Sequence, residues 1–370
     1  MGCLRRKIEG VMTQDGGAPP AFSSPFEGIL YACSLVYEWA MGLRLYLYRK
    51  GIFRQRGLPC KVLSIGNLTV GGTGKTPMVH YVATLLQAAG VEVAVISRGY
   101  GGYAQHSGGL VSDGKTTFMG SEASGDEPQL LAEKLSGIPL FVGKDRYRAA
   151  RRAVRKFGPS VLVLDDGFQH LRIKRDLDLL LLDSTRPLGN GYCIPRGTLR
   201  EPVEQMKRAT AIVFTRWAEG RSTTREYATI EAFAKGRPVF KSLHVPEALH
   251  LAGNGKAVDL AGLKGRRVFA FSGIGRNESF RKTIGELEGH VVGFCEFPDH
   301  YRYSDRDLRS IWKRARELKV HSIITTEKDF VKICTEIPAP PALLVLAISI
   351  SFGADRQRFD SYMTDWALSP

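Results

Sequence analysis

The segment from residue 61 to residue 89 constrains the fold most, because it joins an apolar stretch to a glycine-rich loop and then to a helical pattern. Residues 61–65 are predicted to form a buried strand, and residues 76–89 a helix with apolar side chains at helical spacing. Closely spaced glycines let backbone N–H groups approach phosphate oxygens, and the helix N-terminus adds partial positive charge. The sequence therefore predicts a phosphate-binding loop made of Gly71, Gly72, Thr73, Gly74, Lys75 and Thr76.

Two side chains of this loop have the chemistry for nucleotide binding. Lys75 can reach the terminal phosphates, and the hydroxyl of Thr76 is placed to bind Mg²⁺. The loop departs from the strict pattern at one position, where Thr69 stands in place of glycine. The alternative is a glycine-rich turn without a ligand, but the flanking strand and helix favour the phosphate interpretation.

A regular alternation of strands and helices follows the loop. Apolar runs typical of buried strands lie at residues 91–96, 138–142, 161–164, 177–182 and 211–214, with helical patterns near 126–136 and 145–157. The alternation starts again near residue 267, with strands at 268–271, 290–294, 321–325 and 342–350 and helices at 277–286 and 304–318. This rhythm predicts an α/β fold with a mostly parallel sheet.

The same patterns divide the chain into five segments. Residues 1–24 have few large apolar side chains and are predicted to form a flexible tail, followed by a helix over residues 25–57. A core domain is expected over residues 58–245 and a smaller α/β domain over residues 246–350, because proline and glycine break the order between them. Residues 351–370 are expected to form a helix that packs back on the core.

The charge balance points to phosphate-bearing partners. Lys and Arg number 52 against 37 for Asp and Glu, which gives a net charge of +15. Nucleic acid, anionic lipid or a phosphorylated ligand would each be attracted, although no recognisable nucleic-acid-binding signature is present. The six cysteines are scattered without a Cys-x-x-Cys pair, which argues against a structural zinc site and a disulfide framework.

Residues 25–56 combine an apolar helical stripe with aromatic side chains and a basic end. Glu38 and Arg44 interrupt the stripe, so it lacks the roughly 20 apolar residues needed to span a bilayer. Tyr and Trp beside Arg and Lys are typical of a helix lying in the headgroup region of an anionic membrane. A helix packed on the protein core is the alternative, and composition does not decide between the two.

Asp165 and Asp166 stand at the carboxyl end of an apolar strand, where ligands bind in open α/β sheets. Two adjacent carboxylates are electrostatically costly without a cation, so we expect them to hold Mg²⁺. The alternative is a polar turn that caps the strand. Gln169 and His170 follow within reach of the same region.

Three further acidic motifs have plain structural interpretations from spacing alone. Asp126 suits the N-cap of a helix, and His300 stands in a loop beside Asp299. Thr326 can cap a helix that begins in the segment TTEKD.

Seven motifs occur in one order between about residues 28 and 330, namely GNLTVGGTGKTP, SRGYGG, GDEP, DDGFQH, PRGTLREP, FPDHY and TTEKD. Together they resemble the lipid A 4′-kinase family, the tetraacyldisaccharide 4′-kinases. The resemblance implies a P-loop NTPase-like core, a membrane-associated N-terminal helix, a second smaller α/β domain, and the use of ATP and Mg²⁺. The reaction implied is transfer of the γ-phosphate of ATP to the 4′-hydroxyl of tetraacyldisaccharide 1-phosphate, an acylated glucosamine disaccharide, in lipopolysaccharide biosynthesis.

The resemblance also implies roles for individual residues. Lys75 and Thr76 match the loop lysine and its Mg²⁺-binding neighbour, and Asp165 and Asp166 match the metal-associated pair. Asp126 matches the catalytic base and His300 its partner, with the two placed in different domains. Positions near substrate or metal are matched by Tyr100, Gln169, His170, Arg200 and Glu201.

The implied setting is the cytoplasmic face of an inner membrane, with the anionic bilayer surface and the acylated disaccharide as partners and no nucleic acid. Two rival functions remain at this stage: a nucleotide-hydrolysing switch, which the glycine-rich loop alone would permit, and a nucleic-acid-binding protein. Acyl-chain preference and oligomeric state do not follow from the sequence.

Overall fold

The computed structural model describes residues 2–13, 24–217, 225–253, 255–333 and 341–370. The chain forms two compact units. Unit 1 consists of Met1–Ile96, Arg146–Leu243 and Phe352–Pro370, and unit 2 of Ser97–Asp145 and His244–Ser351.

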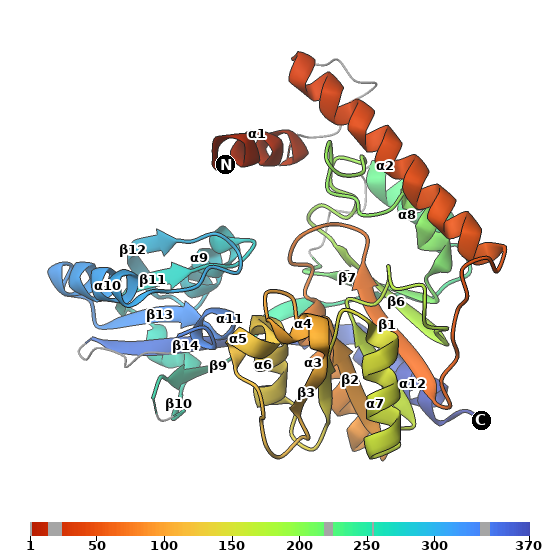
Figure 1. Ribbon diagram of the computed structural model, residues 1–370. Coiled ribbons are helices and arrows are strands. Elements are labelled where there is room, and N and C mark those ends of the chain that lie inside the picture. Colours follow the sequence, from red (N-terminus) through yellow and green to blue (C-terminus); the bar gives the residue numbers. More distant parts are fainter. Residues whose placement is uncertain (1, 14–23, 218–224, 254, 334–340) are drawn as a thin grey trace. The chain divides into compact units, whose positions relative to one another are not determined.

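Six parallel strands form the sheet of unit 1, in the order β2-β5-β1-β6-β7-β8. Their bounds are β1 Lys61–Asn67, β2 Val93–Ser97, β5 Val161–Asp165, β6 Leu177–Asp183, β7 Ala211–Thr215 and β8 Val239–Lys241. The helices of this unit's sheet are α3 Lys75–Ala88, α7 Arg146–Phe157, α8 Arg225–Ala234 and α12 Arg356–Leu368 (Figure 1). Strands β2, β5, β6 and β7 are buried at every position, as expected of parallel strands covered on both faces. The predicted α/β class is confirmed.

Helix α2 (Pro25–Arg49) is one long helix that begins where the side chain of Ser24 accepts a hydrogen bond from the N–H of Glu27 (Figure 1). It is attached to the rest of unit 1 through side-chain hydrogen bonds from Ser34 to the carbonyl of Cys193 at 2.8 Å and from Tyr37 to that of Arg200 at 2.8 Å. In the part of the chain that the structure describes, none of the helices combines the length and the apolar character that a bilayer-spanning segment requires.

The predicted flexible tail over residues 1–24 needs correction at Gly2–Thr13, which form helix α1. Val11 of this helix is buried, and its carbonyl accepts a hydrogen bond from Arg196 at 3.1 Å. A tertiary contact of this kind overrides a composition that is poor in apolar residues. The rest of the predicted tail, residues 14–23, lies outside the described residues.

The C-terminal helix α12 packs on α3, the helix that follows the glycine-rich loop. Phe359 is fully buried and stacks on Phe352 with ring centroids 3.9 Å apart, while Tyr81 of α3 donates a hydrogen bond to Asp360 at 2.7 Å. Lys61, at the start of β1, donates a hydrogen bond to the carbonyl of Trp366 at 2.8 Å. The end of the chain therefore supports both elements that flank the loop.

Unit 2 contains a six-stranded sheet of order β10-β9-β14-β13-β11-β12. Its elements are β9 Leu243–Leu251, β10 Ala257–Val258, β11 Arg267–Ser272, β12 His290–Glu296, β13 Ser322–Thr326, β14 Ala342–Ser351, α9 Asn277–Glu286, α10 Asp305–Glu317 and α11 Glu327–Phe330. Short 3₁₀ helices span Leu260–Leu263 here, and Val203–Arg208 and Gly353–Asp355 in unit 1. Successive side chains of β11 point to opposite faces of the sheet. Val268 belongs to the hydrophobic cluster that includes residues of α9, and Phe269 to the one that includes residues of α10, so both faces of the sheet are covered.

The segment 97–145 groups with this sheet, although the sequence placed it in the core domain over residues 58–245. It holds α4 Ala104–Ser107, β3 Gly109–Ser112, α5 Ser121–Ser124, α6 Asp126–Lys134 and β4 Leu140–Val142, with β3 and β4 antiparallel. Two salt bridges join α6 to α11: Lys134 to Glu327 at 3.0 Å and Lys328 to Glu127 at 3.1 Å. Such long-range ion pairs leave no signal in a local hydrophobic pattern, which explains the misplaced boundary.

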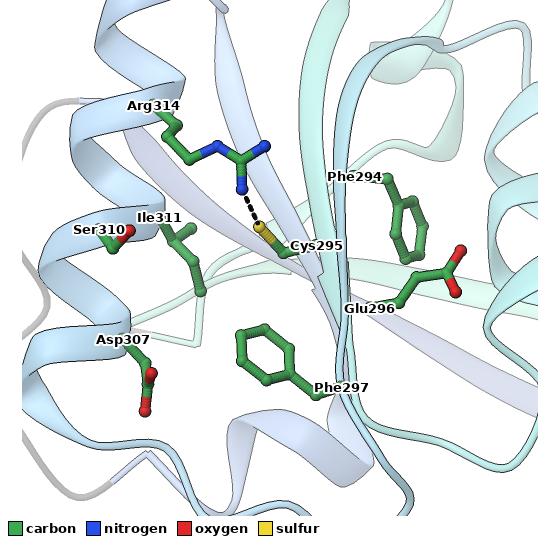
Figure 2. Close-up of a pocket in the computed structure, with 8 residues that line it drawn as sticks. All are labelled: Phe294, Cys295, Glu296, Phe297, Asp307, Ser310, Ile311 and Arg314. Atoms are coloured by element: carbon green, nitrogen blue, oxygen red, sulfur yellow. Dashed lines mark hydrogen bonds between the residues drawn. The ribbon is translucent and has the colours of Figure 1, made fainter. Parts of the chain in front are cut away.

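A cavity of about 350 Å³ lies in unit 2 between the edge strand β12 and helix α10 (Figure 2). Arg314 of α10 donates a hydrogen bond across it to the sulfur of Cys295 at 3.0 Å. None of the site residues predicted from the sequence lines this cavity.

Replacing Phe359 by alanine tests the support that α12 gives to unit 1. The substitution empties a fully buried site between α12 and its neighbours, so the free energy of unfolding should fall by about 3–5 kcal/mol in denaturant titrations. Phe118→Ala, at a position that is 55% exposed, is the control and should cost less than about 0.5 kcal/mol. An equally small effect at Phe359 would mean that α12 does not stabilise the unit.

Candidate active site

The glycine-rich loop lies between the carboxyl end of β1 and the first turn of α3. Gly71 and Gly74 have φ angles of 114° and 85°, conformations that residues with a Cβ adopt only at a cost. Gly74 is the N-cap of α3, so the helix begins directly after it with Lys75. The predicted loop is therefore placed at the edge of the sheet where parallel α/β proteins bind ligands.

Two residues that sequence reasoning missed hold the backbone of this loop. The hydroxyl of Thr215 donates a hydrogen bond to the carbonyl of Thr73 at 3.0 Å, and Arg216 donates one to the carbonyl of Gly72 at 2.9 Å. Arg216 also forms an ion pair with Asp183. A signal was available, because Asp183 and Thr215 end two neighbouring apolar strands.

Asp166 is the centre of an ionic cluster beside the loop. Arg200 donates two hydrogen bonds to its carboxylate, both at 2.9 Å, and the ammonium of Lys75 lies 3.7 Å away. Burial alone would raise the pKa of Asp166, but the positive charges of Lys75 and Arg200 hold it well below its ordinary value. Lys75 also donates a hydrogen bond to the side chain of Asn67 at 3.3 Å.

The other predicted residues of unit 1 lie around this cluster. Gln169 donates a hydrogen bond to the carbonyl of Asn67 at 3.0 Å, and His170 is half-buried in the same turn. Glu201 is fully buried and pairs with Arg208 at 2.5 Å. Gln169 is thereby brought to the end of β1, while one oxygen of Glu201 is used within the fold.

The side chains at this edge of the sheet offer oxygen donors suited to Mg²⁺. Asp165 is buried at the end of β5, Thr76 stands in the first turn of α3, and the buried hydroxyl of Thr73 has no hydrogen-bond partner. Within the described ranges, no three His, Cys, Asp or Glu side chains are grouped to hold a metal ion. Mg²⁺ commonly takes only one or two protein carboxylates and fills its shell with water and phosphate oxygens. The donor set therefore fits a cation that binds together with a nucleotide.

Unit 2 contains a carboxylate–histidine pair. Nδ1 of His300 lies 2.9 Å from one carboxylate oxygen of Asp126 and 3.1 Å from the other, although the residues are 174 positions apart. Asp126 stands at the first position of α6, after Gly125. The predicted partners are thus brought together, and both belong to unit 2 and not to different domains.

Electrostatics shifts the pKa values of the two members of this pair in opposite directions. Burial would raise the pKa of Asp126, but the hydrogen bond from His300 and the charge of Lys328 lower it below its ordinary value. The hydrogen bond to Asp126 raises the pKa of His300 more than burial and Lys328 lower it. A buried carboxylate that remains deprotonated beside a polarised imidazole is suited to accept a proton.

Tyr100 stands next to the pair and is 56% exposed. Its ring centroid lies 5.4 Å from that of His300. The guanidinium of Arg98 lies over the same Tyr100 ring, 5.9 Å from its centroid. His300 and Asp166 both have positive φ angles, 61° and 50°. Surrounding contacts must maintain this conformation in both loops.

A glycine-rich loop followed by Lys75 and Thr76 after the first strand of a parallel sheet, together with a carboxylate–histidine pair, is the arrangement expected of a P-loop phosphotransferase. Comparison with known proteins narrows this class. The family model described as LpxK, tetraacyldisaccharide-1-P 4′-kinase, matches residues 26–367, and the chain belongs to this family.

Named relatives agree over most of the chain. The tetraacyldisaccharide 4′-kinase of Desulfatibacillum aliphaticivorans is 41% identical over 98% of this chain and 98% of its own length. That of Syntrophus aciditrophicus is 43% identical over 84% of this chain and 85% of its own length. The crystal structure of LpxK from Aquifex aeolicus in complex with ATP is 32% identical, with a TM-score of 0.73 over 92% of this chain and 99% of that one.

Lys75→Ala should weaken ATP binding by roughly 10- to 100-fold, because it removes one charge-assisted contact to phosphate, worth about 1.5–3 kcal/mol. It should also lower the free energy of unfolding, because Asp166 loses one of its two cationic partners. Calorimetric titration with ATP and Mg²⁺ measures the change, and Lys115→Ala, an exposed lysine in unit 2, is the control. Unaltered affinity in Lys75→Ala would show that the loop does not bind the nucleotide.

Proposed function

We propose that Asp126 is the base of an ATP-dependent phosphoryl transfer to the 4′-hydroxyl of tetraacyldisaccharide 1-phosphate. That 4′-phosphorylation is the reaction of the family to which the chain belongs, and the chain is accordingly a kinase of lipid A synthesis that uses ATP. One observation supports the choice of base above others: a carboxylate only 7% exposed, held ionised by its hydrogen bond with His300.

Unit 1 would bind the phosphoryl donor. Phosphoryl transfer depends on positioning and charge neutralisation more than on covalent chemistry. The N–H groups of residues 71–74 and the ammonium of Lys75 would hold the β- and γ-phosphates. Mg²⁺, when bound, supplies further positive charge against these oxygens, and Thr76 with Asp165 would hold it. Asp166 would keep Lys75 and Arg200 in place through its ion pairs.

Unit 2 would handle the proton of the acceptor. The 4′-hydroxyl loses its proton as its oxygen bonds to phosphorus, and the carboxylate of Asp126 would take that proton. The Nδ1–H of His300 donates a hydrogen bond to the same carboxylate and fixes its orientation. A base must be unprotonated to work, so activity should fall at low pH, and the acid limb belongs to the coupled pair and not to one residue.

The candidates for substrate contact differ in what supports them. Tyr100 is supported best, because its ring is exposed and adjacent to His300. Gln169, His170 and Arg200 surround the ionic cluster of unit 1. Glu201 is supported least, because it is fully buried and paired with Arg208.

Asp126→Asn and His300→Ala should each lower kcat by about 10²–10⁴-fold, since each disables general base catalysis. The double variant should cost little more than the worse single one, because the two residues act as a unit. The measurement is the rate of 4′-phosphate formation at saturating ATP. If the fold-loss in kcat of the double variant equals the product of the two single losses, Asp126 and His300 act separately.

We also propose that α2 lies on the cytoplasmic surface of the inner membrane, where ATP is available. One face of α2 is buried against unit 1 through Leu30, Ser34 and Leu45. Large apolar side chains on the rest of the helix are exposed, namely Ile29, Leu35, Val36, Trp39, Leu43 and Tyr46. The basic residues Arg49, Lys50, Arg54 and Arg56 follow and are exposed. An apolar stripe that ends in basic residues fits the headgroup region of an anionic bilayer.

Val36→Glu combined with Trp39→Glu should reduce binding to phosphatidylglycerol vesicles at least about tenfold, because two 68% exposed apolar side chains are lost from the contact. Co-sedimentation measures the bound fraction. Phe118→Glu combined with Leu318→Glu places the same charges on exposed apolar positions of unit 2 and should leave binding intact. Equal effects of the two pairs would argue against α2 as the membrane contact.

A further inference from the structure

The segment TTEKD, whose local interpretation was a helix cap, places a lysine near the carboxylate–histidine pair. Thr326 does cap α11, accepting a hydrogen bond from the N–H of Asp329 at 3.1 Å. Lys328, on the same short helix, extends its ammonium to two carboxylates. It lies 3.1 Å from Glu127 and 3.2 Å from Asp299.

The two partners of Lys328 are the chain neighbours of the proposed catalytic pair. Glu127 follows Asp126 at the start of α6, and Asp299 precedes His300 in the loop after β12. One ammonium therefore links the backbone segment that carries the base to the segment that carries its partner. The side chain of Lys328 is only 21% exposed, so both contacts form where water competes weakly.

We propose that Lys328 is a positioning residue for the base: it holds α6 and the loop at His300 in register so that Asp126 and His300 stay in hydrogen-bond contact. The inference rests on the proposed role of Asp126 and extends it to a residue that touches neither of the reacting atoms. The His300 loop needs such support, because His300 has a positive φ of 61°, a conformation that surrounding contacts must maintain.

Lys328 also acts through its charge. The charged groups that face Asp126 are His300, Lys328 and Lys332. Those that face His300 are Lys328, Asp126 and Asp299. The positive charge of Lys328 lowers the pKa of both members of the pair, and its removal also exposes His300 to the uncompensated carboxylate of Asp299. Both pKa values should therefore rise when the ammonium is lost.

The chain offers a matched control in Lys134. This lysine joins the same two helices from the opposite direction, since it lies on α6 and pairs with Glu327 of α11 at 3.0 Å. It pairs as well with Glu247 at 3.2 Å and is similarly buried, at 19% exposure. None of its ionic partners neighbours Asp126 or His300 in the chain. Lys134 thus also forms a salt bridge between α6 and α11, but it lacks the proposed link to the base.

The experiment compares Lys328→Met, Lys328→Arg and Lys134→Met across a pH series at saturating acceptor. Lys328→Met should lower kcat about tenfold or more at neutral pH and move the acid limb of kcat upward by roughly half a unit to one unit. The KM for ATP should stay within about twofold. Lys328→Arg, which keeps the charge, should restore most of the rate, and Lys134→Met should leave the pH profile in place.

Titration of the His300 imidazole by NMR gives a readout that does not depend on catalysis. Its pKa should rise in Lys328→Met and stay unchanged in Lys134→Met. Full activity in Asp126→Asn would overturn the base assignment and with it this inference, whereas an unmoved His300 titration in Lys328→Met would overturn this inference alone. If Lys328→Met and Lys134→Met have indistinguishable kinetics, the salt bridges of Lys328 serve only the stability of the fold, and the positioning role is wrong. If Lys328→Met does not fold, Lys328→Gln takes its place, with the same criteria.

Discussion

Two carboxylates held ionised by neighbouring groups, Asp126, which is buried, and Asp166, which is half-buried, are the constraint on which the site depends. Burial raises the pKa of both carboxylates, and the charges of Lys75 and Arg200 at Asp166, and the hydrogen bond of His300 and the charge of Lys328 at Asp126, lower it below the ordinary value. In both places the cation comes from a distant part of the chain, so the chemistry of the carboxylate depends on the fold. A site built this way is destabilised when one partner is removed, because a buried charge is then left uncompensated.

Hydrogen bonds to backbone carbonyls connect the site of unit 1 to α2, the helix proposed to bind the membrane. Arg200, which holds Asp166, accepts the hydrogen bond of Tyr37 at its backbone carbonyl. The carbonyl of Gln169 accepts a hydrogen bond from Arg44 at 3.1 Å. Two turns that carry site residues are thereby fixed directly to α2. If α2 contacts the lipid surface as proposed, these hydrogen bonds connect that contact to the turns that carry Arg200 and Gln169.

The parallel strands and the loop could be predicted because their signals are local. Buried parallel strands appear as apolar runs, and residues 71–76 carry the glycines, lysine and threonine within one turn. Short edge elements such as β3 and β10 carry too few residues for a period to show. The helix at Gly2–Thr13 and its contact with Arg196 could not be predicted either, because a tertiary contact and not composition decides them.

The carboxylate–histidine pair could not be derived from spacing. Asp126 and His300 are 174 positions apart, and each has a sufficient structural explanation by itself. Resemblance to a family brought them together, and the structure supplied the hydrogen bond. Lys328 stands in a motif of the resemblance, but neither it nor Arg216 was given a role from the sequence. Their contacts appear only in three dimensions: one ammonium between two carboxylates, and one guanidinium on a loop carbonyl.

The most direct test of the account follows the label from γ-³²P ATP with purified protein, Mg²⁺ and tetraacyldisaccharide 1-phosphate. The account predicts that label accumulates on the 4′-oxygen of the disaccharide, and that ATP consumption rises with the concentration of the acceptor until it saturates. ATP hydrolysis at a rate indifferent to the acceptor, with all label released as inorganic phosphate, would contradict it.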